Sequence, residues 1–203
     1  MLDTHIRPFV DPPLDAAGRV LARRGVPADA VTVAGLACGL GCAALVAAGQ
    51  PGWALAPLAA SRVLDGLDGA VARAGRASAF GGYLDFTCDV AFYAAVPFAF
   101  ALLDPANALP AAFLIGTFYV NAASLLGFAI LVEKRGAAPG PRARKAFHFA
   151  AGLLEGTETI AFFTAILLFP SLFAPLAWAF GALCLVTAAF RVAEARAYAK
   201  DLP

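Results

Sequence analysis

Runs of apolar residues, each close to twenty residues long, set the strongest limit on what this 203-residue chain can fold into. A helix of roughly 20 apolar residues crosses the hydrocarbon core of a bilayer. Hydrophobic residues make up 61% of the chain and charged residues 14%, whereas soluble domains have about 45–50% and about 25%. Most of the runs also lack the polar face that a helix of a soluble protein needs. The sequence therefore predicts an all-α, polytopic membrane protein.

Six segments have the length and composition of membrane-spanning helices. They are separated by breaks rich in proline, glycine or charge, and their many small residues allow close helix packing. The segments cover approximately residues 31–49, 53–72, 81–103, 109–132, 146–169 and 172–198. Since no internal repeat is visible, we expect a single domain over residues 1–203, with a juxtamembrane segment at 1–28 and a six-helix bundle at 29–203.

A shorter amphipathic stretch at residues 13–24 precedes these segments. In a helix its apolar residues share one face and its charged residues the other, namely Leu14, Ala17, Val20 and Leu21 against Asp15, Arg19 and Arg23. Such a helix can lie in the membrane interface with its arginines near anionic headgroups. The alternative is a solvated first helix that does not contact lipid.

Apart from Arg62, which lies inside the segment 53–72, the basic residues lie at alternate connections between the six segments or toward the two ends of the chain. The loops at 50–52, 104–108 and 170–171 contain neither Lys nor Arg. By the positive-inside rule, the other connections and both termini face the cytoplasm. The net charge of +1 does not indicate a nucleic-acid partner.

Four aspartates lie among these apolar runs, in the segment DGLDGAVARAGRASAFGGYLDFTCD at residues 65–89. Asp65 and Asp68 are three residues apart, and Asp85 and Asp89 are four apart, so each pair shares a helical face. The loop between them turns the chain back, which allows the two pairs to meet. Clustered carboxylates repel one another unless a cation neutralises them. An all-oxygen set suits Mg²⁺ or Mn²⁺ better than Zn²⁺.

Glycines and arginines in the same segment suit a phosphate ligand. Gly69, Gly81 and Gly82 would let a ligand approach the backbone. Arg73 and Arg76 could hold phosphate oxygens bidentately. The residues alone thus indicate a cytoplasm-facing site that handles a nucleotide or lipid phosphate with a divalent ion.

The segment also contains a long signature. It resembles that of the CDP-alcohol phosphatidyltransferase family, with every signature position filled: Asp65-x-x-Asp68-Gly69-x-x-Ala72-Arg73, then Gly81-x-x-x-Asp85-x-x-x-Asp89. The spacer from Arg73 to Gly81 is seven residues, one fewer than in many members. The likeness in topology covers nearly the whole chain, and the segment GLLEGTET at 152–159 is similar to a bacterial branch of unassigned substrate.

The resemblance implies an enzyme of phospholipid biosynthesis in a bacterial inner membrane. It would transfer a phosphatidyl group from CDP-diacylglycerol, or a similar CDP-alcohol, to an acceptor hydroxyl and release CMP. Two divalent ions, Mg²⁺ or Mn²⁺, would be held by Asp65, Asp68, Asp85 and Asp89, and Asp89 would also be the catalytic base. The residues implied to bind the CDP-alcohol are Asp29, Thr32, Gly69, Arg73 and Ser78. The resemblance also implies a homodimer.

The acceptor is open between glycerol phosphate, inositol phosphate, serine, choline and another phosphatidyl lipid. The donor could also be a CDP-headgroup with diacylglycerol as the acceptor. Four charged residues are candidates for the acceptor pocket, namely Arg62, Arg76, Glu155 and Glu158. Arg62 could instead be a structural partner of Asp65. The two glutamates could instead be protonated packing residues that bond to Asn121 or Ser124, since acids inside a membrane helix need a partner.

Two other classes of function fit parts of the sequence. An ion-coupled transporter could use Glu155 and Glu158 to bind its coupling ion. Such a carrier would be expected to have acids near the membrane midplane and repeat symmetry, whereas the four aspartates are predicted at one membrane face. A family member without activity could act as a scaffold, but the complete aspartate set argues against it.

Overall fold

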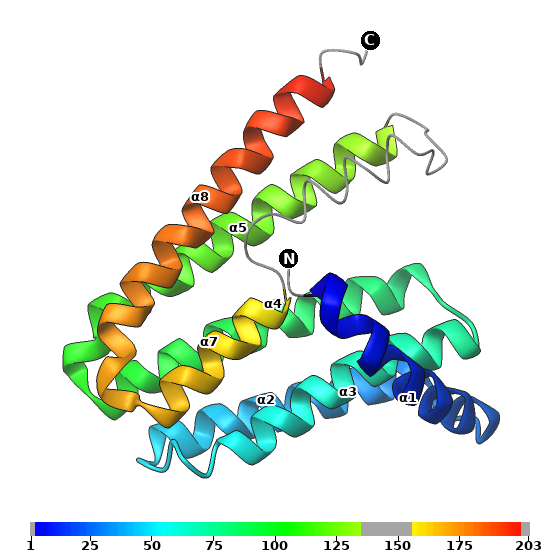
Figure 1. Cartoon of the computed structure of the whole chain (residues 1–203), viewed down its shortest axis with the longest axis horizontal. Coiled ribbons are helices and arrows are strands. Elements are labelled where there is room, and N and C mark those ends of the chain that lie inside the picture. The colour runs from blue at the N-terminus through cyan, green and yellow to red at the C-terminus, as the bar shows by residue number, and fades with distance from the viewer. Residues whose placement is uncertain (1–2, 135–155, 200–203) are drawn as a thin grey trace.

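A computed structural model describes residues 3–134 and 156–199, and these residues form an all-helical structure without strands (Figure 1). The prediction of an all-α fold is confirmed. The α-helices are α1 (Asp3–Arg23), α2 (Ala28–Ala47), α3 (Leu55–Ala74), α4 (Ala79–Leu103), α5 (Ala108–Lys134), α7 (Gly156–Leu168) and α8 (Phe173–Ala199). Two short 3-10 helices, η1 (Pro105–Asn107) and η2 (Pro170–Leu172), lead into α5 and α8.

Four helical stretches are long and apolar enough to cross a membrane: 28–47, 79–103, 105–134 and 170–199. They match four of the six predicted segments within a few residues. Helix α3 matches a fifth in position, but its four charged residues make it more polar, namely Arg62, Asp65, Asp68 and Arg73. Of the predicted segment 146–169, the described residues begin at Gly156, and α7 is an apolar helix of 13 residues.

Helix boundaries follow local capping chemistry. Gly25 adopts a φ of +77°, which ends α1 in the left-handed conformation that favours glycine. Ser78 is the N-cap of α4, because its Oγ accepts a hydrogen bond from the Gly81 N–H at 2.9 Å. Asp104 likewise accepts from the Ala106 N–H at 2.9 Å at the start of η1. These caps separate helices whose apolar sequences would otherwise run together.

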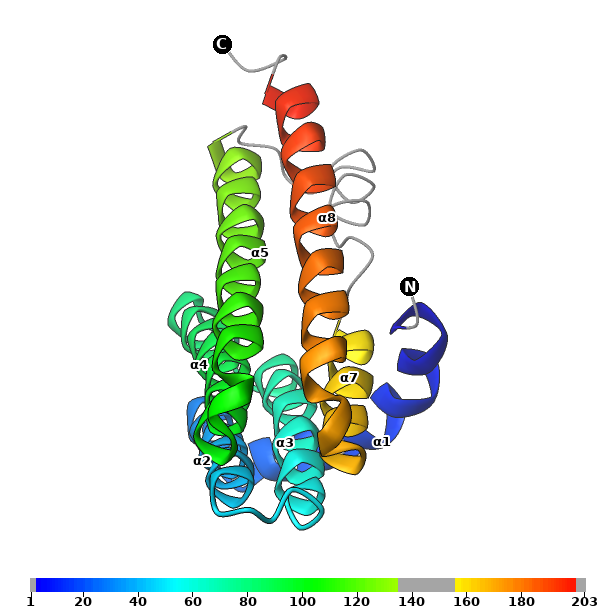
Figure 2. The same ribbon diagram turned by 90° about the vertical axis from the view of Figure 1, so that its left-hand side faces the viewer.

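The helices form two groups that meet at α4. Helix α2 packs against both α3 and α4, and α5 packs against α8. In Figure 1 the α5–α8 pair extends away from the other helices at an angle, and Figure 2 shows the two helices side by side. Aromatic rings fill the junction, where Phe92 lies 5.2 Å from Phe163 and Phe118 lies 6.0 Å from Phe180 between ring centroids.

Helix α1 lies across α3 rather than standing apart from it. A Cβ at Gly18 would lie 2.7 Å from the backbone of Ala70, so only glycine allows this crossing. The helix begins at Asp3, well before the predicted start at residue 13, and contains Pro8, Pro12 and Pro13. Prolines disfavour a helix interior, which is why the sequence predicted a later start.

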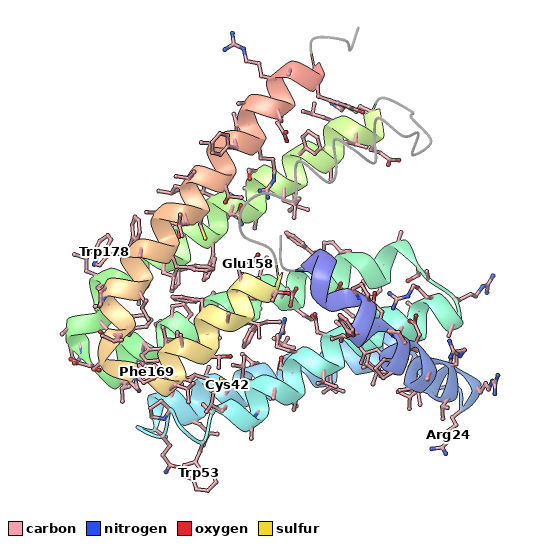
Figure 3. The ribbon with its side chains drawn as sticks, viewed as in Figure 1. Arg24, Cys42, Trp53, Glu158, Phe169 and Trp178 are labelled. Atoms are coloured by element: carbon pink, nitrogen blue, oxygen red, sulfur yellow. The ribbon has the colours of Figure 1, made fainter. Side chains whose placement is uncertain are left out.

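Large apolar side chains cover much of the outer surface. Trp53 is 75% exposed and Phe190 is 62% exposed. Trp53 and Trp178 point away from the helices in Figure 3. An apolar exterior of this extent is expected where a protein surface contacts lipid or another protein.

Candidate active site

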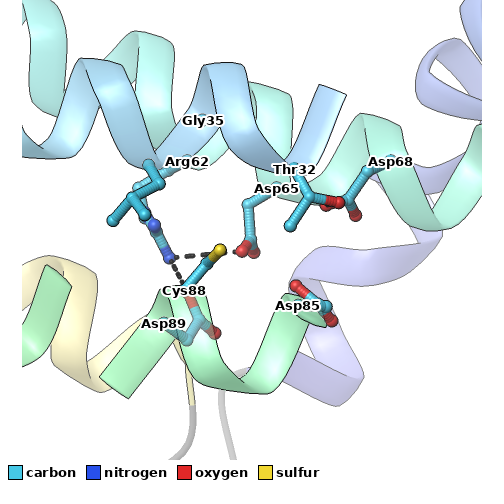
Figure 4. A pocket seen from close by; sticks show the side chains of 9 residues that line it. Thr32, Gly35, Arg62, Asp65, Asp68, Asp85, Cys88 and Asp89 are labelled. Carbon is cyan, nitrogen blue, oxygen red and sulfur yellow. Dashed lines mark hydrogen bonds and ion pairs between the residues drawn. The ribbon is translucent and has the colours of Figure 1, made fainter. Parts of the chain in front are cut away.

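Helices α2, α3 and α4 together line a small cavity that contains all four signature aspartates (Figure 4). The cavity measures about 10 Å³, the size of site that holds a single water molecule. Its lining residues come from α2 (Thr32, Gly35 and Leu36), α3 (Arg62, Asp65 and Asp68) and α4 (Asp85, Cys88 and Asp89). The predicted meeting of the two aspartate pairs is therefore present in the fold.

Helix α2 holds the two aspartate-bearing helices in position. It packs along both α3 and α4. At Gly39 an added Cβ would come within 2.5 Å of the Phe92 ring, so the missing side chain lets α4 approach closely. Phe92 is fully buried at this contact, one turn after Asp89. Gly39 of α2 thus allows the close approach of α4, the helix that carries Asp85 and Asp89.

Three of the carboxylates form a compact cluster. Ligand oxygens of Asp65, Asp85 and Asp89 all lie within 4.8 Å of one another. Oxygens that share one Mg²⁺ at about 2.1 Å lie at most about 4.2 Å apart. The observed spread is close to this value, and the all-carboxylate donor set is the one a hard divalent ion prefers. The residues present therefore fit a divalent metal.

Asp68 lies in the same cavity but has a separate partner. Its Oδ2 accepts a hydrogen bond from the Thr32 hydroxyl at 2.6 Å, and the residue is 5% exposed. Figure 4 shows Thr32 and Asp68 side by side at one end of the site. The hydrogen bond orients a buried carboxylate, which needs donors in such surroundings.

Arg62 contacts the cluster directly. Its Nη1 donates to Asp89 Oδ1 at 2.9 Å and lies 3.5 Å from Asp65 Oδ1. Its guanidinium also lies over the Phe92 ring, 4.4 Å from the centroid. The ion pair with Asp65 that the sequence suggested is present, and the bond to Asp89 joins α3 to α4.

A larger hollow adjoins the N-terminus of α2 and the C-termini of α1 and α3. It measures about 300 Å³, at the lower end of the range for small-molecule sites. Three predicted ligand-binding residues line it, namely Asp29, Arg76 and Ser78. Ser78 is also the α4 cap, so its predicted role in binding and its structural role concern the same hydroxyl.

Two other predicted CDP-binding residues lie outside both cavities. Arg73 is largely exposed, and its Nη2 donates to Asp15 Oδ1 of α1 at 2.8 Å. Gly69 lies beside it, because an added Cβ there would be 3.2 Å from Arg73 Nη1. The structure thus separates Arg73 and Gly69 from Asp29 and Ser78, and Asp15 is a contact that the signature did not indicate.

A second polar cluster joins α5 to α8. Arg191 is 3% exposed, and its Nη1 donates to Asn121 O at 3.0 Å, Asn121 Oδ1 at 2.9 Å and Ser124 Oγ at 2.6 Å. The sequence suggested Asn121 and Ser124 as partners for the two glutamates and did not single out Arg191. Its position within the apolar segment 172–198 was the available signal. Glu155 lies outside the described residues, and half-buried Glu158 is in the first turn of α7.

Comparison with known protein families gives a match over residues 26–193 to the CDP-alcohol phosphatidyltransferase family. The chain belongs to this family of transferases. The match includes the complete signature and every described residue that lines the aspartate cavity. The resemblance noted in the sequence is confirmed, and the chain is an enzyme of the CDP-alcohol phosphatidyltransferase class.

Individual relatives support this assignment. The transferase is 42% identical over 193 residues to the inner membrane protein YnjF of Escherichia coli, covering 95% of this chain and 94% of that one. It is 39% identical over 100 residues to an archaetidylinositol phosphate synthase of Pyrococcus horikoshii, covering 49% and 53% of the two chains. With its apolar helices, the transferase is an integral membrane protein.

A solved structure has the same fold. It is the crystal structure of Mycobacterium tuberculosis phosphatidylinositol phosphate synthase (PgsA1) with CDP-DAG bound. The TM-score is 0.61 at 21% sequence identity, over 90% of this chain and 92% of that one. At 21% sequence identity, this similarity shows that the two proteins share a fold.

Proposed function

We propose that the transferase moves a phosphatidyl group from CDP-diacylglycerol to an acceptor hydroxyl and releases CMP. The observation that carries the proposal is the cluster of Asp65, Asp85 and Asp89, with ligand oxygens within 4.8 Å of one another, in a member of this family. Its similarity in fold to a phosphatidylinositol phosphate synthase with CDP-DAG bound supports a CDP-lipid donor.

The hollow beside the cluster supports a nucleotide ligand. Its volume of about 300 Å³ exceeds that of the aspartate cavity, and it opens next to the same ends of α2 and α3. Polar groups from Asp29, Ser78 and Arg76 line it. We propose that the CDP moiety occupies this hollow, and that Thr32, Gly69 and Arg73 contact the donor when it is bound.

Divalent ions, two of them in our proposal, would be held by Asp65, Asp68, Asp85 and Asp89. When bound, Mg²⁺ or Mn²⁺ would neutralise the pyrophosphate and stabilise charge on the attacking and leaving oxygens. Three carboxylates already face one another, and Asp68 completes the set from the same cavity.

Asp89 is the proposed general base. Its Oδ1 accepts from Arg62, which leaves Oδ2 to accept the proton of the acceptor hydroxyl. The acceptor oxygen forms a bond to the lipid-side phosphorus, and the bond from that phosphorus to the bridging oxygen breaks. The electron pair leaves with CMP. A base of this kind typically contributes a factor of 10²–10⁴ in rate.

The acceptor is proposed only as a hydroxyl compound. Inositol phosphate comes first in our order of testing, because two similar proteins are named as inositol phosphate lipid synthases. Glycerol phosphate, serine and choline follow. Arg76 and Glu158 are the described residues that we propose for acceptor recognition, with Glu155 outside the described residues.

We propose that the chain forms a single domain with six membrane crossings, two of which are α3 and the region of α7. Helix α1 would lie in the membrane interface. Both termini would face the cytoplasm. The support is that the connections at 50–52, 104–108 and 170–171 contain neither Lys nor Arg, whereas the connections that alternate with them do. The exposed Arg19 and Arg23 of α1 would then lie near lipid headgroups. A bacterial inner membrane and a homodimer complete the proposal, the first supported by the name of the E. coli relative.

The deciding experiment uses the purified protein with CDP-diacylglycerol, Mg²⁺ or Mn²⁺ and a panel of acceptors. We expect CMP release that depends on one acceptor, with the lipid product identified by mass spectrometry. The matched control is Asp89→Asn. A parallel ion-flux assay in liposomes tests the transporter alternative. Metal-dependent flux without CMP release would favour a carrier, and neither activity with any acceptor would favour a scaffold.

A further inference from the structure

Arg62 transfers no proton and binds no substrate in the proposed reaction, yet it contacts two of the three clustered carboxylates. Its Nη1 bonds Asp89 Oδ1 at 2.9 Å and lies 3.5 Å from Asp65 Oδ1. The side chain is 11% exposed, compared with 35% for Asp65 and 28% for Asp89. The cation is thus better shielded from solvent than the carboxylates that it neutralises.

The position of the guanidinium is fixed from several sides. Nη2 donates to Ser61 Oγ at 3.1 Å, and the plane of the group lies over Phe92. Nε is buried and has no hydrogen-bond partner among the residues that the structure describes. An arginine that leaves one donor unsatisfied while it keeps its contact with Asp65 and Asp89 is held there by those charges.

The charges of the cluster do not balance. Four carboxylates and one guanidinium line the cavity, and their charges sum to −3 when the acids are ionised. Each divalent ion would offset two of these charges, but it needs oxygens that Arg62 already contacts. Arg62 therefore stabilises the cluster before an ion arrives and repels the ion when it arrives.

We propose that Arg62 is the resident counter-cation of the aspartate cluster. It keeps Asp65 and Asp89 together in the metal-free protein and weakens the intrinsic affinity of the site for a divalent ion. A pyrophosphate group adds the negative charge that offsets this repulsion. Ion and CDP-lipid therefore bind with positive coupling, and each raises the affinity for the other. The inference rests on the proposed metal site and makes Arg62 a positioning residue.

Removal of the charge at position 62 should tighten metal binding rather than disrupt the site. Asp85 and Asp89 are four residues apart on α4, so the helix backbone keeps them on one face without help from Arg62. The loss of one ion-pair partner therefore frees Asp89 Oδ1 for the ion, and the removal of a positive charge at contact distance favours it further.

The test compares the wild type with Arg62→Gln, Arg62→Lys and Arg24→Gln, each purified in detergent and stripped with EDTA. Mn²⁺ alone is the probe, and its affinity is measured by calorimetry or electron paramagnetic resonance without any lipid substrate. We expect Arg62→Gln to bind Mn²⁺ on the order of tenfold more tightly. Arg62→Lys, which keeps the charge, and Arg24→Gln, which removes an exposed charge at the end of α1 (Figure 3), should stay near the wild type.

Thermal unfolding provides a second readout that does not involve activity. In EDTA, Arg62→Gln should unfold at a lower temperature than the wild type because its carboxylates lack a counter-charge. Mn²⁺ should raise the unfolding temperature of the variant back to that of the wild type. Mn²⁺ affinity that is unchanged or weaker in Arg62→Gln overturns the inference. If this variant is misfolded even when purified in Mn²⁺, the inference is also overturned, since an ion then fails to replace the guanidinium.

Coupling to the donor completes the test. CDP-diacylglycerol should raise the Mn²⁺ affinity of the wild type by a larger factor than that of Arg62→Gln. The role of Arg62 and the proposed function can fail independently of each other. CMP release by the wild type, together with unchanged Mn²⁺ affinity in Arg62→Gln, would reject only the role of Arg62. Tighter Mn²⁺ binding without CMP release from any acceptor would reject only the proposed reaction.

Discussion

Arg62 and Arg191 both lie inside the described helical structure, and their hydrogen-bond partners differ. Arg62 contacts carboxylates of two helices beside a cavity. Nη1 of Arg191 donates to a backbone carbonyl, an amide and a hydroxyl, and the carboxylate of Glu194 on the same helix interacts with it electrostatically. The first cluster keeps an excess of negative charge that a divalent ion can neutralise, whereas the bonds of the second join α5 to α8. The partners of a charged residue in an apolar helix therefore indicate whether it belongs to a ligand site or joins two helices.

Removal of the metal should produce the largest difference between the aspartate cluster and the Arg191 cluster. Chelation with EDTA should abolish CMP release, because the pyrophosphate charge and the leaving group then lack their neutralising ion. Mg²⁺ or Mn²⁺ added back should restore the rate. The bonds between α5 and α8 contain no site of this kind among the described residues, so EDTA should leave them intact. Full activity in excess EDTA would contradict the proposed mechanism.

Substitution of Asp89 by Asn should lower CMP release by a factor of about 10²–10⁴, because an amide cannot accept the proton of the acceptor hydroxyl. The helices should remain intact, since Asp89 is partly exposed and its neighbours hold α4 in place. Circular dichroism controls for folding. Turnover equal to that of the wild type would exclude Asp89 as the base.

Replacement of Arg191 by Leu tests the second cluster. Asn121 and Ser124 would lose their buried donor, and loss of one partner in a buried polar network costs about 1–3 kcal/mol or more. The unfolding temperature should fall, and Mn²⁺ should not restore it, in contrast to Arg62→Gln. The measurement is the unfolding temperature with and without Mn²⁺. Restoration by Mn²⁺ would mean that the two clusters are not independent.

Replacement of Thr32 by Val removes the donor to Asp68 while it keeps the shape of the side chain. A buried carboxylate without its hydrogen bond should cost about 1–3 kcal/mol. We expect CMP release to fall roughly tenfold, in line with one lost hydrogen bond of about 1.4 kcal/mol. Thr32→Ser, which keeps the hydroxyl, is the control and should retain most of the activity.

The smallest effect is expected at the exposed ion pair between Arg73 and Asp15. The two side chains are 59% and 39% exposed, and surface pairs contribute at most about 1 kcal/mol. Asp15→Asn should therefore leave the unfolding temperature nearly unchanged. If Arg73 turns toward the donor during binding, the same variant should lower the KM for CDP-diacylglycerol by releasing it. A large loss of stability would show that the pair anchors α1 to α3.

Much of this protein was predictable from its sequence. Apolar length and composition determined the all-helical fold, because a chain in lipid must satisfy its backbone hydrogen bonds within each helix. The spacing of Asp65 with Asp68, and of Asp85 with Asp89, determined that each pair shares a face. Helix ends at capping residues such as Ser78 were also local properties. The start of α1 at Asp3 was not predictable, because Pro8, Pro12 and Pro13 disfavour a helix interior and yet lie inside the helix.

Tertiary structure alone decided which partners these residues meet. It brought Asp65, Asp85 and Asp89 within 4.8 Å while Thr32 held Asp68 apart. It placed Arg62 on Asp89, which is 27 residues away along the chain, and Arg191 on Asn121, which is 70 residues away. Spacing along a helix fixes a face, but the distance between two helices depends on how closely α2 lets them approach, as at Gly39. The sequence therefore determined which charges are present, and packing determined whether each one binds a neighbour or is left for a ligand.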